Sequence, residues 1–248
     1  MRAGLAEEPR TAAETGIAAR VAAFDWEAIE AQINTEGYAM APLFDADDCV
    51  ALSGRYAEEA PFRSRVVMAR HGFGQGEYKY FAYPLPAPVA QLREAMYRPL
   101  ARIANHWNAA LGEAARYPGT HAKYLAQCHA AGQQRPTPLL LQYGAGDYNC
   151  LHQDLYGEHV FPLQLTVLLS RPGEDFSGGE FVLTEQRPRM QSRVAVVPLA
   201  QGDVVIFPVH HRPVQGTRGL YRVNLRHGVS RITRGRRHTL GVIFHDAA

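Results

Sequence analysis

The chain has 248 residues, of which 46% are hydrophobic and 20% charged, with a formal net charge of +2 at pH 7. This composition is ordinary for a globular protein and excludes a disordered or collagen-like chain. No apolar run reaches the roughly 18–20 residues that cross a bilayer, and the N-terminus lacks the apolar core of a signal peptide. Its three scattered cysteines form no Cys-x-x-Cys pair. We therefore expect a cytoplasmic protein that does not enter a membrane.

The first 135 residues predict a tail followed by helices. Residues 1–20, rich in Ala, Glu and Arg, predict a flexible N-terminal tail. Asp25 is a good N-cap residue, and the apolar residues at helical spacing after it continue to about Gly37. Pro99 is expected to kink or split the longest helix. The predicted helices span residues 25–37, 45–59, 87–111 and 121–131.

After Pro136 the sequence takes on the character of a β protein. Short apolar runs alternate with turn signals such as Pro172-Gly173 and Gly178-Gly179. Strands without intervening helices predict a sandwich or jelly roll, with the earlier helices packed against one sheet. We expect one domain over 21–248, with a helical part at about 21–135 and a β core at about 136–246. The eight predicted strands span 138–143, 147–151, 160–169, 179–184, 193–199, 203–207, 220–226 and 238–244.

A His-x-Asp pair lies between two of these strands. In extended backbone, residues i and i+2 point to the same side, so His152 and Asp154 can aim an imidazole and a carboxylate at one point. With a second histidine they would form the facial triad of a non-haem iron(II) oxygenase, which leaves coordination positions open. By itself the pair is also compatible with an ordinary loop histidine beside a turn aspartate.

The third ligand has to come from further along the chain. An oxygenase of this kind that uses a 2-oxoacid also needs a cation for the far carboxylate of that cosubstrate. His227 is followed ten residues later by Arg237, which opens an apolar strand and shares a face with Thr239. His211 is followed at nearly the same spacing by Arg222, so this pair is an alternative. The downstream histidines are His210, His211, His227, His238 and His245.

Taken together, His152-Gln-Asp154, His227 and Arg237 with Thr239 resemble the signature of the iron(II)/2-oxoglutarate-dependent dioxygenases. The resemblance covers roughly residues 138–246. It implies a mainly β (α+β) fold, a double-stranded β-helix or cupin-like jelly roll buttressed by helices. It also implies Fe(II), 2-oxoglutarate and O2 as cofactor and cosubstrates. We prefer His227 over His211 as the distal ligand, which requires a hairpin insertion at about 209–222.

Two segments of the sequence resemble two different branches of that family. The segment from Tyr143 to Asp154 resembles the AlkB-type dioxygenases, in which the tyrosine matching Tyr143 binds 2-oxoglutarate. Phe176-Ser-Gly-Gly-Glu-Phe181 is similar to the prolyl-hydroxylase branch. Leu141 and Ile243 depart from the AlkB pattern, because an asparagine and a second arginine are usual there. The chain as a whole is similar to a bacterial group placed among oxygenases that act on damaged nucleic acid.

The sequence offers two features for a nucleic-acid substrate. Residues 187–237 contain 11 arginines and only one acid, which favours contact with the phosphates of DNA or RNA, with Arg212 and Arg218 as candidates. The glycine-hinged segment 72–84 carries the aromatic residues Tyr78, Tyr80 and Tyr83, which could stack an exposed base or could form a strand packed on the core. The rival interpretations are a protein or peptide hydroxylase of the prolyl type and a catalytically silent jelly-roll module that binds a ligand.

Overall fold

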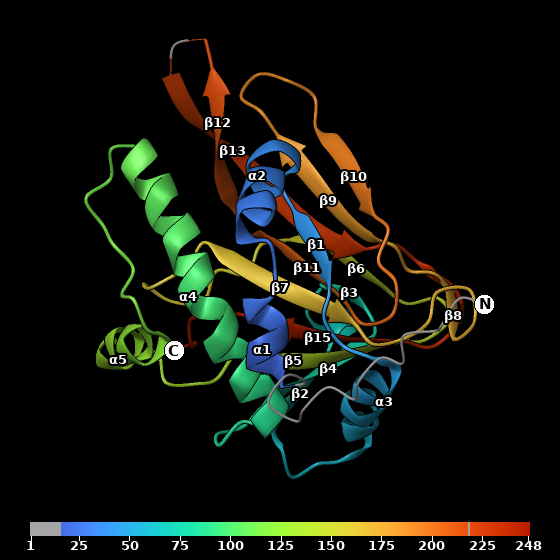
Figure 1. Ribbon diagram of the computed structural model, residues 1–248. Coiled ribbons are helices and arrows are strands. Elements are labelled where there is room, and N and C mark those ends of the chain that lie inside the picture. The colour runs from blue at the N-terminus through green and yellow to red at the C-terminus, as the bar shows by residue number, and fades with distance from the viewer. Residues whose placement is uncertain (1–15, 218) are drawn as a thin grey trace, which may run out of the picture.

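The computed structural model describes residues 16–217 and 219–248, which form two facing antiparallel sheets with helices on one side (Figure 1). The larger sheet has the strand order β1-β11-β7-β15-β5-β4-β2 and the smaller one β10-β9-β13-β6-β3, with β12 paired to β13. A short third sheet pairs β14 with β8. This arrangement is the predicted jelly roll, buttressed by helices.

The strands place alternate side chains in two different cores. In β11, Val204 and Ile206 pack with the helices, whereas Val205 and Phe207 point between the sheets. This period of two is the geometry of a pleated strand buried on both faces. The strands are β1 (Ala39–Pro42), β2 (Phe62–Val67), β3 (Gly74–Gln75), β4 (Glu77–Phe81), β5 (Leu139–Tyr143), β6 (Tyr148–His152), β7 (Leu163–Leu168), β8 (Phe176–Gly178), β9 (Phe181–Gln186), β10 (Arg193–Val197), β11 (Asp203–Pro208), β12 (His211–Gly216), β13 (Gly219–Val229), β14 (Ile232–Gly235) and β15 (Arg237–Val242).

The predicted helices are present, with their caps. The Asp25 carboxylate accepts a hydrogen bond from the Ala28 N–H at 3.0 Å, and Gly37 ends the helix in the left-handed conformation at φ 86°. Pro99 does not split the longest helix, because the buried stripe continues on both sides of it and packs on the same core. The helices are α1 (Ile17–Ala22), α2 (Trp26–Glu36), α3 (Ala46–Gly54), α4 (Ala87–Ala110) and α5 (His121–Ala130), with short 3-10 turns at Arg55–Ala57 and Met68–Arg70.

The N-terminal half differs from the prediction in two respects. It is not purely helical, because β1, β2 and β4 extend the larger sheet and β3 extends the smaller one. Of the predicted flexible tail, residues 1–15 lie outside the described residues, while Ile17–Ala22 form α1 with Val21 buried against α4. All eight strands predicted after Pro136 are present. Within residues 16–217 and 219–248, none of the helices combines the length and apolarity needed to cross a bilayer.

Candidate metal centre and cosubstrate pocket

Strand pairing brings His152, Asp154 and His227 together. β13 pairs with β6, and His152 and His227 are direct partners in that register. Asp154 follows β6 by two residues, and its Oδ1 and Oδ2 lie 3.6 Å from His152 Nε2 and 3.3 Å from His227 Nε2, respectively. One ligand atom from each residue lies within 4.8 Å of the other two, so the three can share one metal ion. Two imidazoles and a carboxylate on one side of a site are the facial-triad donor set for Fe(II).

The charge states of the three ligands suit a metal. His152 Nδ1 lies 2.8 Å from the Cys150 carbonyl, which can only accept, so the proton is on Nδ1 and Nε2 is free to ligate. Burial lowers the pKa of His227, which favours the neutral imidazole that a metal ion needs as a ligand. Burial opposes ionisation of Asp154, but its contacts with His227, His152 and Tyr156 hold the pKa of this carboxyl well below its usual range.

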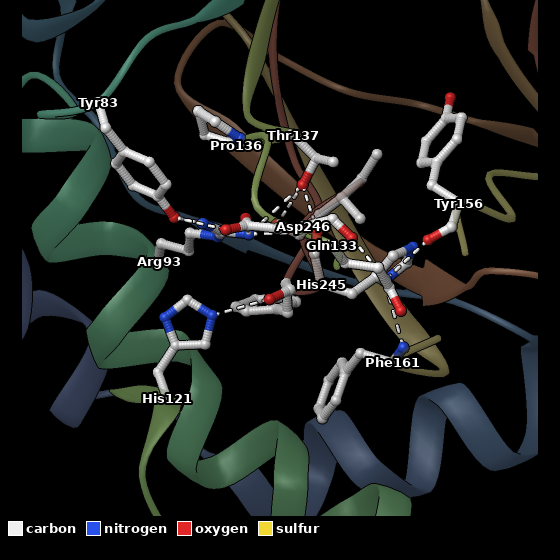
Figure 2. Close-up of polar contacts among 12 residues, drawn as sticks. Tyr83, Arg93, His121, Gln133, Pro136, Thr137, Tyr156, Phe161, His245 and Asp246 are labelled. Atoms are coloured by element: carbon white, nitrogen blue, oxygen red, sulfur yellow. Dashed lines mark hydrogen bonds and ion pairs between the residues drawn. The ribbon is translucent and has the colours of Figure 1, made fainter. Parts of the chain in front are cut away.

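Tyr156 fixes the carboxylate of Asp154, a role that the sequence did not reveal. Its hydroxyl donates to Asp154 Oδ1 at 2.7 Å, and the Tyr80 hydroxyl lies 3.4 Å from it. Gln133 donates to the backbone carbonyl of Tyr156 at 2.9 Å and also to that of Asp246, so it connects the Asp154 loop with the C-terminal segment (Figure 2). The only signal in the sequence was that Tyr156 lies two residues after Asp154.

A cavity of about 190 Å³ lies beside the triad, between the two sheets. Arg237, Thr239 and Tyr143 all line it and are 1%, 2% and 0% exposed. The guanidinium of Arg237 lies 5.8 Å and 5.7 Å from the ring centroids of Tyr143 and Phe176. Among residues 16–217 and 219–248, Arg237 is the only arginine or lysine that lines this cavity.

The far end of the cavity fits the distal carboxylate of 2-oxoglutarate. Arg237 Nε and NH1 and the Tyr143 hydroxyl are buried without a hydrogen-bond partner among the described residues. Burial lowers the pKa of Arg237 to about 10, so it stays protonated at neutral pH, whereas burial raises the pKa of Tyr143, which stays neutral. A buried, unpaired cation is costly unless an anion binds beside it. Arg237, Tyr143 and Thr239 would therefore hold that carboxylate.

The alternative ligands lie elsewhere. The side chain of His211 on β12 packs on His210, with ring centroids 3.8 Å apart, and does not line the cavity. Arg222 is half exposed and forms an ion pair with Glu113. The hairpin β12–β13 is the insertion that the choice of His227 requires, and it projects from the smaller sheet (Figure 1).

The predicted substrate residues divide into two groups. Tyr78 and Tyr80 line the cavity from β4, as the base-stacking hypothesis requires, and their rings meet edge to face at 5.3 Å. Tyr83 does not: its hydroxyl donates to Asp246 Oδ2 at 2.9 Å and accepts from Arg93 at 3.0 Å (Figure 2). Tyr83 therefore does not line the cavity, and its role as a substrate contact stays a prediction.

The arginine-rich region is not one surface. Arg212 is 1% exposed and donates to Glu185 Oε2 at 2.6 Å and to the Thr35 carbonyl, so it braces the fold and does not face a substrate. Arg218 lies outside the described residues. Arg226, Arg231 and Arg236 are exposed, and no ion pair joins them to an acidic group in the described ranges. Only such exposed arginines are available to phosphates.

The jelly roll, the His-Asp-His triad and the arginine-lined cavity define the class of 2-oxoglutarate- and Fe(II)-dependent oxygenases. Solved structures with this fold include a prolyl-4-hydroxylase from Pseudomonas putida, with a TM-score of 0.53 and 16% identity over 90% of this chain and 100% of that one. A prolyl hydroxylase from Trichoplax adhaerens in complex with a hypoxia inducible factor peptide fragment has a TM-score of 0.54 and 13% identity, over 89% of each chain. At such identities the likeness concerns the fold alone.

The family itself is identified from sequence. Residues 76–247 match the Oxygenase-NA family, described as an oxygenase catalysing oxidative methylation of damaged DNA. The match covers more than half of the chain, which belongs to this family. Uncharacterised proteins from two strains of Mycobacterium tuberculosis are 46% identical over 199 residues, which is 80% of this chain and 80% of each relative. The protein is thus a 2-oxoglutarate-dependent non-haem iron dioxygenase of the Oxygenase-NA family.

Proposed function

We propose that the protein oxidises a damaged or modified base of a nucleic acid, by hydroxylation that removes an N-methyl group as formaldehyde. The observation that carries this proposal is the aromatic wall of the cavity beside the triad, formed by Tyr78, Tyr80 and Phe73. A base that is turned out of its stack is bound by stacking between such side chains. The description of the family, which concerns damaged DNA, supports the same substrate class.

The residues of the site have separable roles in this reaction. His152, Asp154 and His227 would hold Fe(II), and Arg237, Thr239 and Tyr143 would hold the distal carboxylate of 2-oxoglutarate. When bound, the metal with 2-oxoglutarate and O2 supplies the oxidising chemistry, and succinate and carbon dioxide are the co-products. The chain orients the ligands, encloses the cosubstrate away from water and presents the C–H bond to the metal. Hydroxylation of an N-methyl group gives an N-hydroxymethyl group, which releases formaldehyde.

Tyr80 is placed to present a base. The guanidinium of Arg63 lies 4.5 Å from its ring centroid on one side, and its hydroxyl points toward Tyr156, beside Asp154. Because these two contacts already fix the ring of Tyr80, the side chain loses little conformational entropy when a base stacks on its other face. Base stacking on an aromatic ring is worth about 1–3 kcal/mol. We therefore expect Tyr80→Ala to lower kcat/KM for an oligonucleotide about tenfold or more.

The test measures formaldehyde released from methylated DNA and RNA oligonucleotides, with Asp154→Ala as the inactive control. Wild-type protein should release formaldehyde in proportion to succinate. The Tyr80→Ala variant should lose oligonucleotide turnover yet keep its affinity for 2-oxoglutarate. Absence of formaldehyde, together with a mass gain of one oxygen on a proline-containing peptide, would contradict the proposal and favour a peptide hydroxylase.

Contact with the nucleic-acid backbone can be tested separately. Each phosphate contact that is lost should reduce the salt dependence of binding, because fewer counterions are released. We expect single Arg→Ala changes at Arg226, Arg231 and Arg236 to identify which exposed arginines meet phosphates, by a shallower slope of log affinity against log salt. Unchanged slopes in all three variants would contradict phosphate contact by this region.

A further inference from the structure

Four residues that line the cavity carry a buried polar atom with no hydrogen-bond partner among the described residues: Tyr143, Gln164, His227 and Arg237. Tyr143 and Arg237 would bind the distal carboxylate of 2-oxoglutarate, and the unpaired atom of His227 is the Nδ1 of a metal ligand. Gln164, through its Nε2, is the one of the four that belongs to neither set. Buried amide groups in proteins are nearly always paired, so an unpaired one that lines a cavity indicates an acceptor supplied by a ligand.

Gln164 points into the cavity because of its place in β7. Leu163 and Leu165 on either side belong to the helix-facing core, so Gln164 has the opposite, inner orientation. It is 2% exposed. A side chain that is this deeply buried and polar is present at a cost in stability, which favours a functional over a structural explanation.

The register of the sheet places Gln164 at the metal end of the cavity. Its partner in β11 is Phe207, whose ring packs 4.8 Å from that of His227. On the other side, β15 pairs Val242 with Leu165, so the next residue, Ile243, flanks Gln164. Arg237 lies at the opposite end of β15, paired with Tyr143. The unpaired donors therefore lie at both ends of the cavity, one set near Arg237 and the other near the triad.

A 2-oxoacid with a second carboxylate needs donors at both ends. Its distal carboxylate matches Arg237, and its keto-acid end would lie beside the metal ligands. Two other polar side chains at that end are engaged: Tyr156 donates to Asp154, and the amide of Gln153 donates to the carbonyls of His210 and Leu225. Leu141 and Ile243 also line the cavity and are apolar. Gln164 is thus a buried, unpaired amide donor at the metal end of the cavity.

We propose that the side-chain amide of Gln164 donates a hydrogen bond to the metal-proximal carboxylate of 2-oxoglutarate and so positions the cosubstrate. Gln164 would supply, from β7, the donor that Leu141 and Ile243 cannot provide. The inference rests on 2-oxoglutarate as the cosubstrate and is independent of whether the oxidised substrate is a base or a peptide.

The test compares two ligands and two variants under anaerobic conditions with Fe(II) bound. Levulinate keeps the ketone and the distal carboxylate of 2-oxoglutarate but has a methyl group in place of the proximal carboxylate. Gln164→Met, which keeps the length but removes the donor, should weaken 2-oxoglutarate binding about tenfold to a hundredfold, the usual effect of losing a hydrogen bond to a charged group. Its affinity for levulinate should stay within about twofold of wild type. Arg237→Met should weaken both ligands.

A second variant keeps the proposal testable if Gln164→Met unfolds. Gln164→Glu removes the donor and places a carboxylate opposite the ligand, so it should weaken 2-oxoglutarate binding more than levulinate binding. Thermal unfolding of each variant shows whether the fold is intact.

Wild-type affinity for 2-oxoglutarate in either folded variant, or an equal loss of affinity for 2-oxoglutarate and levulinate, would overturn the proposal. Failure of wild-type protein to bind 2-oxoglutarate would overturn it as well, whereas normal binding without oxidation of oligonucleotides would contradict only the proposed substrate.

Discussion

At the scale of single residues, Tyr156 should control metal affinity through Asp154. Loss of a hydrogen bond that orients a metal ligand typically costs about 10–100-fold in affinity. We therefore expect Tyr156→Phe to weaken Fe(II) or Co(II) binding about tenfold, measured by titration of the metal-free protein. Tyr83→Phe is the matched control, because it also loses a buried hydroxyl contact, but to Asp246. Equal metal affinity in Tyr156→Phe and wild type would show that the hydroxyl does not position the ligand.

Arg237 should show opposite effects on binding and on stability. Its guanidinium is buried, and two of its nitrogens have no hydrogen-bond partner in the described parts of the chain, so it lowers the stability of the protein without cosubstrate. Arg237→Met should raise the dissociation constant of 2-oxoglutarate by about a hundredfold or more, since at least two charge-assisted bonds are lost. Thermal unfolding without 2-oxoglutarate should occur at the same or a higher temperature than in wild type. A large loss of stability would mean that Arg237 is structural.

At the scale of elements, the β12–β13 hairpin is held by two arginines of different character. Arg212 is buried against Glu185, whereas Arg222 is half exposed and paired with Glu113. Breaking a buried pair typically costs about 3–5 kcal/mol, and an exposed pair about 0–1 kcal/mol. Chemical denaturation should therefore show a large loss of stability for Arg212→Ala and a small one for Arg222→Ala. Similar losses in the two variants would contradict the bracing role assigned to Arg212.

Some elements could be predicted from local signals and others could not. The α2 helix carries its own cap at Asp25 and its own stop at Gly37, and the strands after Pro136 repeat apolar runs between turns. By contrast, β4 is stabilised by pairing with β5, with Tyr78 opposite Leu141. Such pairing is not encoded near Tyr78 in the chain, so the N-terminal strands were missed or left ambiguous.

The same limit applies to the site. The spacing within His152-Gln-Asp154 is local and was informative, but the choice between His227 and His211 depends on which strand pairs with β6, and that strand is β13 with His227 and not β12 with His211. Arg212 looked like part of a basic surface because the sequence does not show that Glu185 and α2 enclose it. The position of Gln164 could not be predicted, because it lies in an apolar run of a strand whose side chains face two different cores.

At the scale of the whole molecule, buried histidines should make the fold sensitive to acid. Burial lowers the pKa of His121 to about 3 and that of His245 to about 4, from 6.5. Below 6.5 the unfolded chain binds protons that the folded chain does not, so stability present above that pH is lost as the pH falls toward 4. The free energy of unfolding should decrease by up to about 1.4 kcal/mol per pH unit for each such histidine.

Urea denaturation across this pH range measures the effect. His121 Nε2 lies 2.8 Å from the Phe244 carbonyl and must carry its proton there, so His121→Gln keeps a donor without the titrating ring. The slope of unfolding free energy against pH should be smaller in that variant by about one proton. An unchanged slope would show that the acid sensitivity arises elsewhere.

The most direct test of the iron-binding triad is the rate of succinate formation in two matched histidine variants. With Fe(II), 2-oxoglutarate and O2 supplied, His227→Ala should fall to the background rate, because it removes a metal ligand that lies beside Asp154. His211→Ala should retain turnover close to wild type, because His211 does not line the cavity. Succinate formation that survives in His227→Ala and is lost in His211→Ala would contradict the assignment.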